Sequence, residues 1–188
     1  MATVPPRIAV VGTGGTISSL GASSLDVLDY PDFGRKLGCE ALLERFPETR
    51  LVADPVPVTF RQVGSTEIGP NEWVGLRALI HRIAREDPAV AGFVIPHGTA
   101  TIEETAFFLN LTLATSQPVV VVGAQRPASA LGTDAGMDLV IKHDQHPFAA
   151  GLGRAGDAQR IDEIHAGISA ERARRPLCAD HYRWLGCR

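Results

Sequence analysis

Cysteine is scarce in this sequence, which holds three: Cys39, Cys178 and Cys187. An odd number of cysteines without a Cys-x-x-Cys spacing provides neither a disulfide framework nor a structural zinc site. The sequence therefore predicts three ordinary free thiols.

The sequence also lacks an excess of charge of either sign and a long apolar run. The basic residues number 18 and the acidic residues 21, a formal net charge of -3, so no basic face is predicted that could follow a phosphate backbone. No apolar run approaches the roughly 20 residues that cross a bilayer. Neither nucleic acid nor a membrane is therefore expected as a partner. Residues 1–6 have no charged segment ahead of a long apolar stretch and a cleavage site, so the protein is expected to be cytoplasmic.

What the sequence does have is an alternation of strand-like and helix-like segments. Strands are expected where β-branched or alternating apolar residues occur, at 7–13, 56–63, 90–95 and 118–122. Helices are expected where apolar residues recur at helical spacing, at 37–46, 70–85 and 101–113. This alternation predicts an α/β fold with a parallel, doubly wound sheet.

Two connections carry local predictions of their own. Residues 17–36, rich in Ser, Gly and Asp, are expected to form a long surface loop, for which a lid over a site is one role. The segment Thr101-Ile-Glu-Glu104 has the form of a capping box. It is predicted to fix the turn from His97 to Ala100 at the start of the following helix.

The first candidate site is Gly12-Thr-Gly-Gly-Thr16, at the end of the first expected strand. Open α/β sheets bind ligands at the carboxyl ends of their strands, and glycines there let backbone N–H groups approach a ligand closely. A phosphate loop would need a third glycine where Ile17 stands, or a following lysine, and the sequence has neither. A tight turn without a chemical role is the alternative.

The second candidate site is His97-Gly-Thr-Ala-Thr101, at the end of another expected strand. Parallel strands bring their carboxyl ends to one edge of a sheet, so Thr16 and Thr99 are expected to face one pocket. Two hydroxyls surrounded by backbone N–H groups suit acyl transfer, in which one hydroxyl attacks a carbonyl and the amides stabilise the oxyanion.

Together, Thr13-Gly-Gly-Thr-Ile17 and His97-Gly-Thr-Ala-Thr-Ile-Glu-Glu-Thr105 resemble the two signature motifs of the bacterial L-asparaginase and glutaminase family. Residues 120–127 and 132–136 resemble its next two segments, so the resemblance runs from about Arg7 to Leu139. It implies a three-layer, mostly parallel, flavodoxin-like domain such as the asparaginase N-terminal domain. It also implies hydrolysis of the side-chain amide of L-asparagine to L-aspartate and ammonia through a threonine acyl-enzyme, without a metal or an organic cofactor.

The resemblance also implies roles for single residues. Thr16 takes the role of the acylated nucleophile, Tyr30 that of its helper, and Thr99 that of the second threonine beside the scissile carboxamide. Ser65 resembles the serine that holds the substrate α-carboxylate, and a turn residue without that role is the alternative. The other substrate-binding positions that the resemblance implies are Gly15, Thr66, Gly98 and Ala100.

The sequence departs from the family pattern at two places. Ala100 stands where the family commonly has the aspartate that binds the substrate amino group, and alanine accepts no hydrogen bond there. The lysines are Lys36 and Lys142, and neither lies in the Asp-Val-Thr-Lys-Thr segment that supplies the family's lysine. Residues 162–166 faintly resemble the start of that segment, and counting onward from them puts Arg172 near the position of the missing lysine. A guanidinium, however, stays protonated and makes a poor base.

These departures leave two other hypotheses open. One is a catalytically silent, asparaginase-like domain that binds a ligand or a partner without turnover. The other is a different amide substrate, such as glutamine, for the same chemistry.

The composition changes after Val140, where valine no longer occurs and histidine and arginine become frequent. This change predicts an asparaginase-like domain over residues 1–140 and a divergent tail over residues 141–188, truncated or frame-shifted, in place of the family's second domain. The His143 and His146 pair has a spacing that one helix face could present to a metal, but solvated surface histidines are the favoured interpretation. A sheet edge left open after Val122 would favour homo-oligomers.

Overall fold

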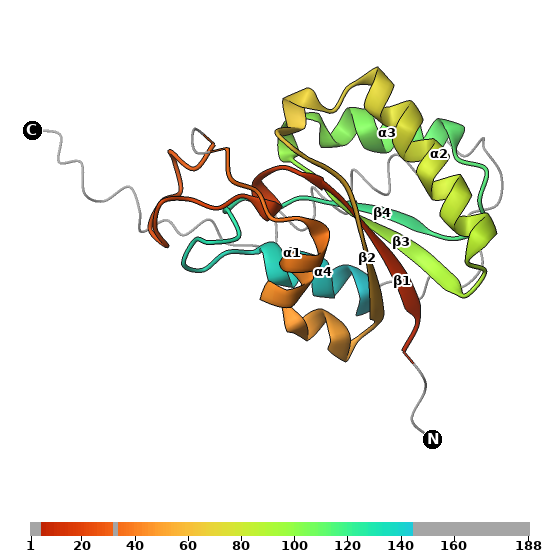
Figure 1. The fold of residues 1–188 in the computed structure, drawn as a ribbon, viewed down its shortest axis with the longest axis horizontal. Coiled ribbons are helices and arrows are strands. Elements are labelled where there is room, and N and C mark those ends of the chain that lie inside the picture. The colour runs from red at the N-terminus through yellow and green to blue at the C-terminus, as the bar shows by residue number, and fades with distance from the viewer. Residues whose placement is uncertain (1–4, 32–33, 145–188) are drawn as a thin grey trace, which may run out of the picture. The chain divides into compact units, whose positions relative to one another are not determined.

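The computed structural model of this protein describes residues 5–31 and 34–144. Its centre is a four-stranded sheet, drawn in Figure 1, in the order β2-β1-β3-β4. The strands are β1 (Arg7–Gly14), β2 (Asp54–Val63), β3 (Val90–Pro96) and β4 (Val119–Val122). All three neighbouring pairs are parallel. The predicted α/β fold with a parallel sheet is therefore confirmed.

Helices cover both faces of this sheet. They are α1 (Cys39–Arg45), α2 (Pro70–Glu86), α3 (Ile102–Thr112) and α4 (Ala135–Asp144). In Figure 1, α2 and α3 lie on one face and α1 and α4 on the other, which makes the three layers expected from the sequence. The strand order and the two helical layers are those of doubly wound folds, which bind ligands at the carboxyl ends of their strands.

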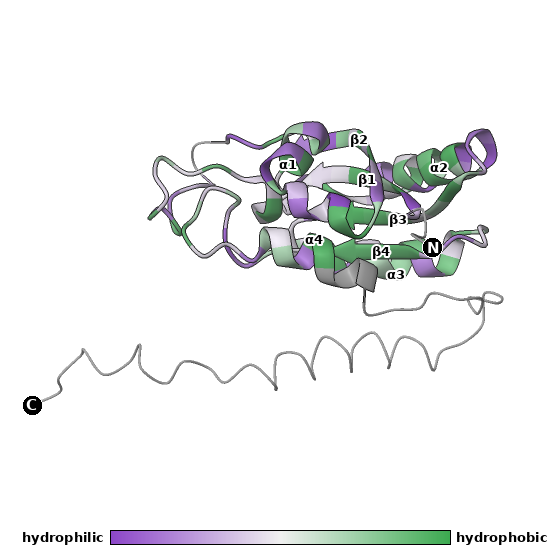
Figure 2. Cartoon of the chain, turned by 90° about the horizontal axis from the view of Figure 1, so that it is seen from below, coloured by the Kyte–Doolittle hydropathy of each residue, from purple (hydrophilic) through white to green (hydrophobic). Residues whose placement is uncertain are grey.

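Strand β1 is buried on both faces because it lies between the two helical layers. Ile8 and Val10 belong to a core cluster that includes Leu42 and Leu43 of α1 and Leu139 of α4. The intervening Ala9 and Val11 belong to a second cluster, which contains residues of the helices on the opposite face: Leu76, Ile80 and Leu109. In Figure 2, β3 and β4 are coloured largely as hydrophobic, whereas hydrophilic residues are interspersed along the helices. Burying each large apolar side chain stabilises the fold by about 1.5–3 kcal/mol.

Helix α2 illustrates how the apolar spacing becomes a buried face. It begins at Pro70, whose missing N–H costs nothing in the first turn. Leu76 and Ile80, four residues apart, are fully buried, while Leu79 and Ile83 pack at the margin of the same cluster. The predicted helix and its apolar face are confirmed.

The capping box predicted at Thr101 is wrong. The Thr101 side chain makes no capping hydrogen bond to α3, and its hydroxyl instead donates to the carbonyl of Ser65 at 2.6 Å. A side-chain contact of the capping-box kind occurs elsewhere, where Glu67 Oε1 accepts the N–H of Gly64 at 2.9 Å. The Thr101 hydroxyl therefore links its own turn to the turn that contains Ser65, and it does not cap α3.

Helix α4 was not predicted from the sequence. It continues past Val140 to Asp144, and thus crosses the proposed boundary between domain and tail. That boundary remains a prediction. Residues 145–188, including Arg172, Cys178 and Cys187, lie outside the described residues, as does the side chain of His143.

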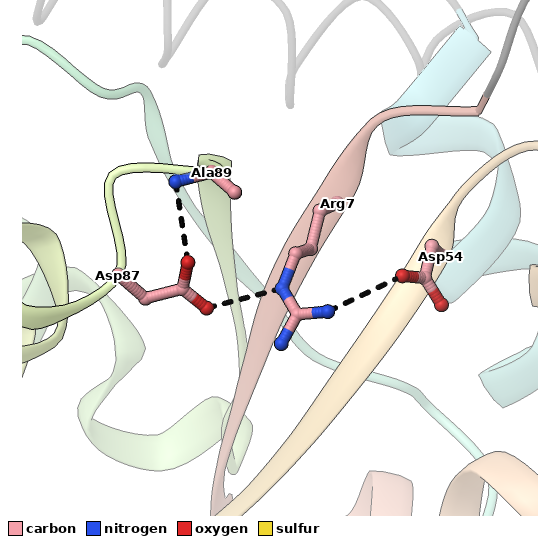
Figure 3. Close-up of polar contacts among 4 residues, drawn as sticks. All are labelled: Arg7, Asp54, Asp87 and Ala89. Carbon is pink, nitrogen blue, oxygen red and sulfur yellow. Dashed lines mark hydrogen bonds and ion pairs between the residues drawn. The ribbon is translucent and has the colours of Figure 1, made fainter.

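At the amino ends of the strands, Arg7 joins three segments (Figure 3). Its guanidinium lies 3.6 Å from the carboxylate of Asp54 on β2 and 3.0 Å from that of Asp87, which precedes β3. An open hollow here is lined by residues that include Arg7, Arg50 and Asp54, and its lining contains no residue of the two predicted threonine motifs. Surface ion pairs of this kind contribute about 1 kcal/mol or less.

Cys39 begins α1 and is buried. Burial raises the pKa of its thiol to about 11, so the thiol stays protonated at neutral pH, and its sulfur donates to the carbonyl of Val10 at 2.9 Å. The predicted free thiol is confirmed for this cysteine.

Within the described ranges, no helix has the length and apolar character needed to span a bilayer.

Candidate functional site

The carboxyl ends of β1, β2 and β3 meet at three small residues, Gly15, Ser65 and Gly98. A Cβ atom added to Gly15 would lie 2.2 Å from the Cα of Gly98, and one added to Gly98 would lie 2.5 Å from the Cβ of Ser65. Real side chains do not approach so closely, so only glycine fits at positions 15 and 98. Thr16 and Thr99 each follow one of these two touching glycines, which brings the two predicted threonine motifs to the same edge of the sheet.

The backbone on the Thr16 side has a shape that glycine alone adopts without strain. Gly14 and Gly15 have φ angles of 112° and 75°. The N–H of Gly15 donates to the carbonyl of Val63 at 2.9 Å, and the Gly15 carbonyl accepts the hydroxyls of Ser18 and Ser19 at 3.2 and 2.8 Å. These bonds fix the short 3-10 turn at residues 16–18 that begins with Thr16.

Thr16 is half-buried, and its hydroxyl contacts the loop predicted between residues 17 and 36. Thr16 Oγ1 lies 2.9 Å from the phenol oxygen of Tyr30, and either oxygen can donate. The loop is closed at its base, where Ser19 pairs with Lys36 in an antiparallel bridge. The structure therefore brings the predicted helper to the predicted nucleophile.

On the opposite side, the segment from Thr99 to Thr101 forms another 3-10 turn. The hydroxyl of Ser65 accepts the N–H of Ala100 at 3.2 Å, and Thr101 donates to the Ser65 carbonyl. Because Ser65 uses its oxygen as an acceptor here, its own hydroxyl hydrogen stays available for a ligand. Thr99, Ala100 and Thr66 are exposed to solvent at this edge.

A buried hydrogen-bonded chain supports the second turn from behind. His97 Nδ1 lies 2.7 Å from the carbonyl of Gly98, which can only accept, so Nδ1 carries the hydrogen. Burial lowers the pKa of His97, partly opposed by the bond to Gly98 and by Glu104, so the ring is neutral and Nε2 is an acceptor. Thr105 donates to Nε2 at 3.0 Å and accepts the indole N–H of Trp73 at 2.9 Å.

This chain of donors and acceptors fixes the orientation of the peptide just before Thr99. His97 and Thr105 are fully buried, so each polar atom in the chain depends on its partner. The indole of Trp73 also stacks on Phe108, with ring centroids 5.7 Å apart. The sequence predicts a helix over residues 70–85 that contains Trp73 and a motif that contains Thr105, but it assigns neither residue a role at the site. The polar His97, directly after an apolar strand, is a signal that buried hydrogen-bond partners are needed, but nothing in the sequence identifies Thr105 and Trp73 as those partners.

The arrangement suits chemistry at a carbonyl group. It offers two threonine hydroxyls, a phenol on one of them, and backbone held rigidly by close glycine contacts. Among the described residues, no group of three His, Cys, Asp or Glu side chains is placed to hold a metal ion. The roles of Thr16, Thr99, Tyr30, Gly15, Ser65, Thr66, Gly98 and Ala100 remain predictions.

Known proteins resemble this chain over the part that carries the site. The family model described as the asparaginase N-terminal domain matches residues 7–141. Probable L-asparaginase 4 of Schizosaccharomyces pombe is 40% identical over 136 residues, which are 72% of this chain and 37% of that protein. The glutaminase-asparaginase of Acinetobacter glutaminasificans is 39% identical over 133 residues, which are 71% of this chain and 39% of that protein.

A solved structure agrees with these matches. The crystal structure of a probable cytoplasmic L-asparaginase from Campylobacter jejuni aligns with a TM-score of 0.64 at 36% identity, over 72% of this chain and 40% of the other. The matched region thus amounts to only 37 to 40% of the length of these relatives.

Proposed function

Since this chain belongs to the asparaginase family, we propose that it is an amidohydrolase that cleaves the side-chain amide of L-asparagine. The observation that carries the proposal is the junction of Gly15, Ser65 and Gly98, which sets the two threonine motifs side by side at the ligand-binding edge of the sheet. The names of the relatives, L-asparaginase and glutaminase-asparaginase, give the class of substrate.

In the proposed reaction, Thr16 Oγ1 forms a bond to the amide carbon of the substrate. The hydroxyl proton of Thr16 passes by way of Tyr30, 2.9 Å away, toward the leaving nitrogen. The carbon–nitrogen bond breaks, ammonia leaves, and an aspartyl ester remains on Thr16. Water then attacks this ester, releases aspartate and restores the threonine hydroxyl.

The other residues bind and orient the substrate. The free hydrogen of Ser65 donates to the α-carboxylate, while Thr99 lies beside the carboxamide. The solvent-exposed residues Thr66 and Ala100 and the closely packed backbone of Gly15 and Gly98 shape the pocket. No metal or organic cofactor takes part in these steps.

Ammonia release from L-asparagine tests the proposal. The wild-type chain is expected to release ammonia, and the Thr16→Ala and Thr99→Val variants to lose that activity, because each lacks one of the two hydroxyls. Thr112→Val is a suitable control, since the Thr112 hydroxyl bonds only within α3, to the carbonyl of Phe108. Activity that persists in both site variants would reject the assignment of the site. Glutamine in the same assay reports the substrate preference.

Two features of the sequence favour a second candidate, a silent binding domain. Ala100 offers no carboxylate to the substrate amino group, and the sequence holds only two lysines, neither within the expected motif. This candidate predicts that calorimetry detects heat of binding for aspartate or asparagine, while no ammonia is released.

We also propose that the protein acts in the cytoplasm as a homo-oligomer. Strand β4 is the last strand on its side of the described sheet, and an open sheet edge favours association with another copy.

A further inference from the structure

The loop that carries Tyr30 is built around one carboxylate. Asp26 Oδ2 accepts the N–H of Ala22 at 2.9 Å, and Asp26 Oδ1 accepts the N–H groups of Asp29 and Tyr30 at 2.9 and 3.0 Å. A single side chain therefore binds both limbs of the loop. Hydrogen bonds to a charged acceptor are roughly twice as strong as those between neutral groups.

The limb on the Ala22 side is itself anchored to the body of the domain. The N–H of Gly21 donates to the hydroxyl of Ser129 at 2.8 Å, and the N–H of Leu131 donates to the carbonyl of Ser24 at 2.7 Å. Asp26 thus connects a fixed limb to the limb that ends in Tyr30. Through these bonds the position of Tyr30 depends on residues far away in the sequence.

The burial of apolar side chains contributes little to the stability of this loop. Leu25 is 76% exposed and Leu28 is 82% exposed, although they flank Asp26 on both sides. Side chains so open to water gain almost no stability from packing. The conformation of the loop therefore depends on its polar contacts.

We propose that Asp26 is a positioning residue, whose carboxylate holds the backbone of Tyr30 so that its phenol meets the Thr16 hydroxyl. This inference rests on the proposed function for its catalytic meaning, but the geometric part stands without it. The hydrogen bonds lower the pKa of Asp26 below its ordinary value, that from Ala22 most strongly, as expected for a carboxylate that accepts several N–H groups.

Four variants test the proposal by ammonia release from L-asparagine. Asp26→Ala is expected to lower kcat/KM roughly ten- to hundredfold, because small displacements of a catalytic group have effects of that size. Asp26→Asn keeps one acceptor oxygen for Asp29 and Tyr30 and is expected to lose much less. Asp29→Ala removes a like charge from the same loop without removing these bonds and is expected to match the wild type. In a Tyr30→Phe background, Asp26→Ala is expected to change the rate less than about twofold, because the group it positions is already gone.

A second readout needs no activity. The sequence has two tyrosines, so Tyr182→Phe leaves Tyr30 as the single tyrosine that tetranitromethane can nitrate, and the nitrotyrosine absorbance reports on it alone. Asp26→Ala is expected to speed nitration of Tyr30 several-fold, with Asp29→Ala unchanged. If the parent chain releases no ammonia but nitration follows this pattern, the positioning role stands and the proposed function fails. Unchanged nitration in Asp26→Ala, equal losses in the Ala and Asn variants, or a full loss that persists in the Tyr30→Phe background would each overturn the inference.

Discussion

The hydroxyl oxygens of Thr16 and Tyr30 lie 2.9 Å apart, although 14 positions separate the two residues in the sequence. Thr16 belongs to a turn fixed by glycine contacts, whereas Tyr30 lies in a surface loop. Their contact joins a rigid element to a segment held mainly by polar bonds. The geometry of the proposed catalytic pair therefore depends on the shape of the loop as well as on the sheet.

Tyr30→Phe removes the phenolic hydroxyl from this pair and leaves the aromatic ring in place. We expect kcat for asparagine hydrolysis to fall about 100-fold, the usual contribution of a positioned proton donor or acceptor. Thermal unfolding of the variant should stay close to that of the wild type, because the side chain is only half-buried. A Tyr30→Phe enzyme with wild-type kcat would remove the phenol from the mechanism.

Gly98→Ala tests the junction of the strands. The φ angle of Gly98 is -81°, which alanine adopts easily, so the effect comes from the added Cβ alone. That atom would lie 2.5 Å from the Cβ of Ser65, and we expect a loss of about 1–3 kcal/mol in the free energy of unfolding, measured in urea. Gly69→Ala is the control for an uncrowded Cβ, because its nearest neighbour would be 4.0 Å away, and as the N-cap of α2 it should lose only about 1 kcal/mol or less. Equal stability in both variants would show that the junction tolerates a side chain.

Thr105→Val tests the buried chain behind the second turn. Valine fills the same space but leaves both Trp73 Nε1 and His97 Nε2 without a partner. The free energy of unfolding is expected to fall by about 2–3 kcal/mol, because buried unsatisfied groups keep their full desolvation cost. Thr112→Val on the same helix should cost less than about 1 kcal/mol in the same urea titration. A small loss in the free energy of unfolding of Thr105→Val would mean that water reaches the hydrogen-bonded chain of His97, Thr105 and Trp73.

Much of the fold follows from sequence periodicity, because buried parallel strands and amphipathic helices each leave a clear apolar pattern. Strand β1 and helix α2 were predicted to within a residue. The Thr101 hydroxyl was misassigned because capping boxes are defined by local spacing, while its actual partner, Ser65, is 36 positions away.

The support of the site was harder to predict. The motifs predict Thr16 and Thr99 as the candidate threonines, and the parallel topology brings their two segments to one edge of the sheet. The bonds of Asp26, and those between His97, Thr105 and Trp73, depend on loop shape and on contacts between separate elements. No local pattern in the sequence encodes such contacts.

His97 makes stability depend on pH. Burial holds its folded-state pKa below the ordinary value of 6.5, so the unfolded chain binds a proton more readily. The stabilisation is complete above about pH 6.5 and falls as the pH drops below that value toward the folded-state pKa. Urea titrations from pH 7.5 to 5 should therefore show a decline in the free energy of unfolding that is shallower in His97→Gln. Parallel curves for the two proteins would contradict a buried neutral imidazole.

The most direct test of the account is the capture of an acyl group from Thr16. With hydroxylamine added to asparagine, an aspartyl ester on the enzyme should divide between water and hydroxylamine, so wild-type protein should form aspartyl hydroxamate along with aspartate. Thr16→Ala should form neither. Amide hydrolysis without any hydroxamate, or hydroxamate formed by Thr16→Ala, would contradict Thr16 as the nucleophile.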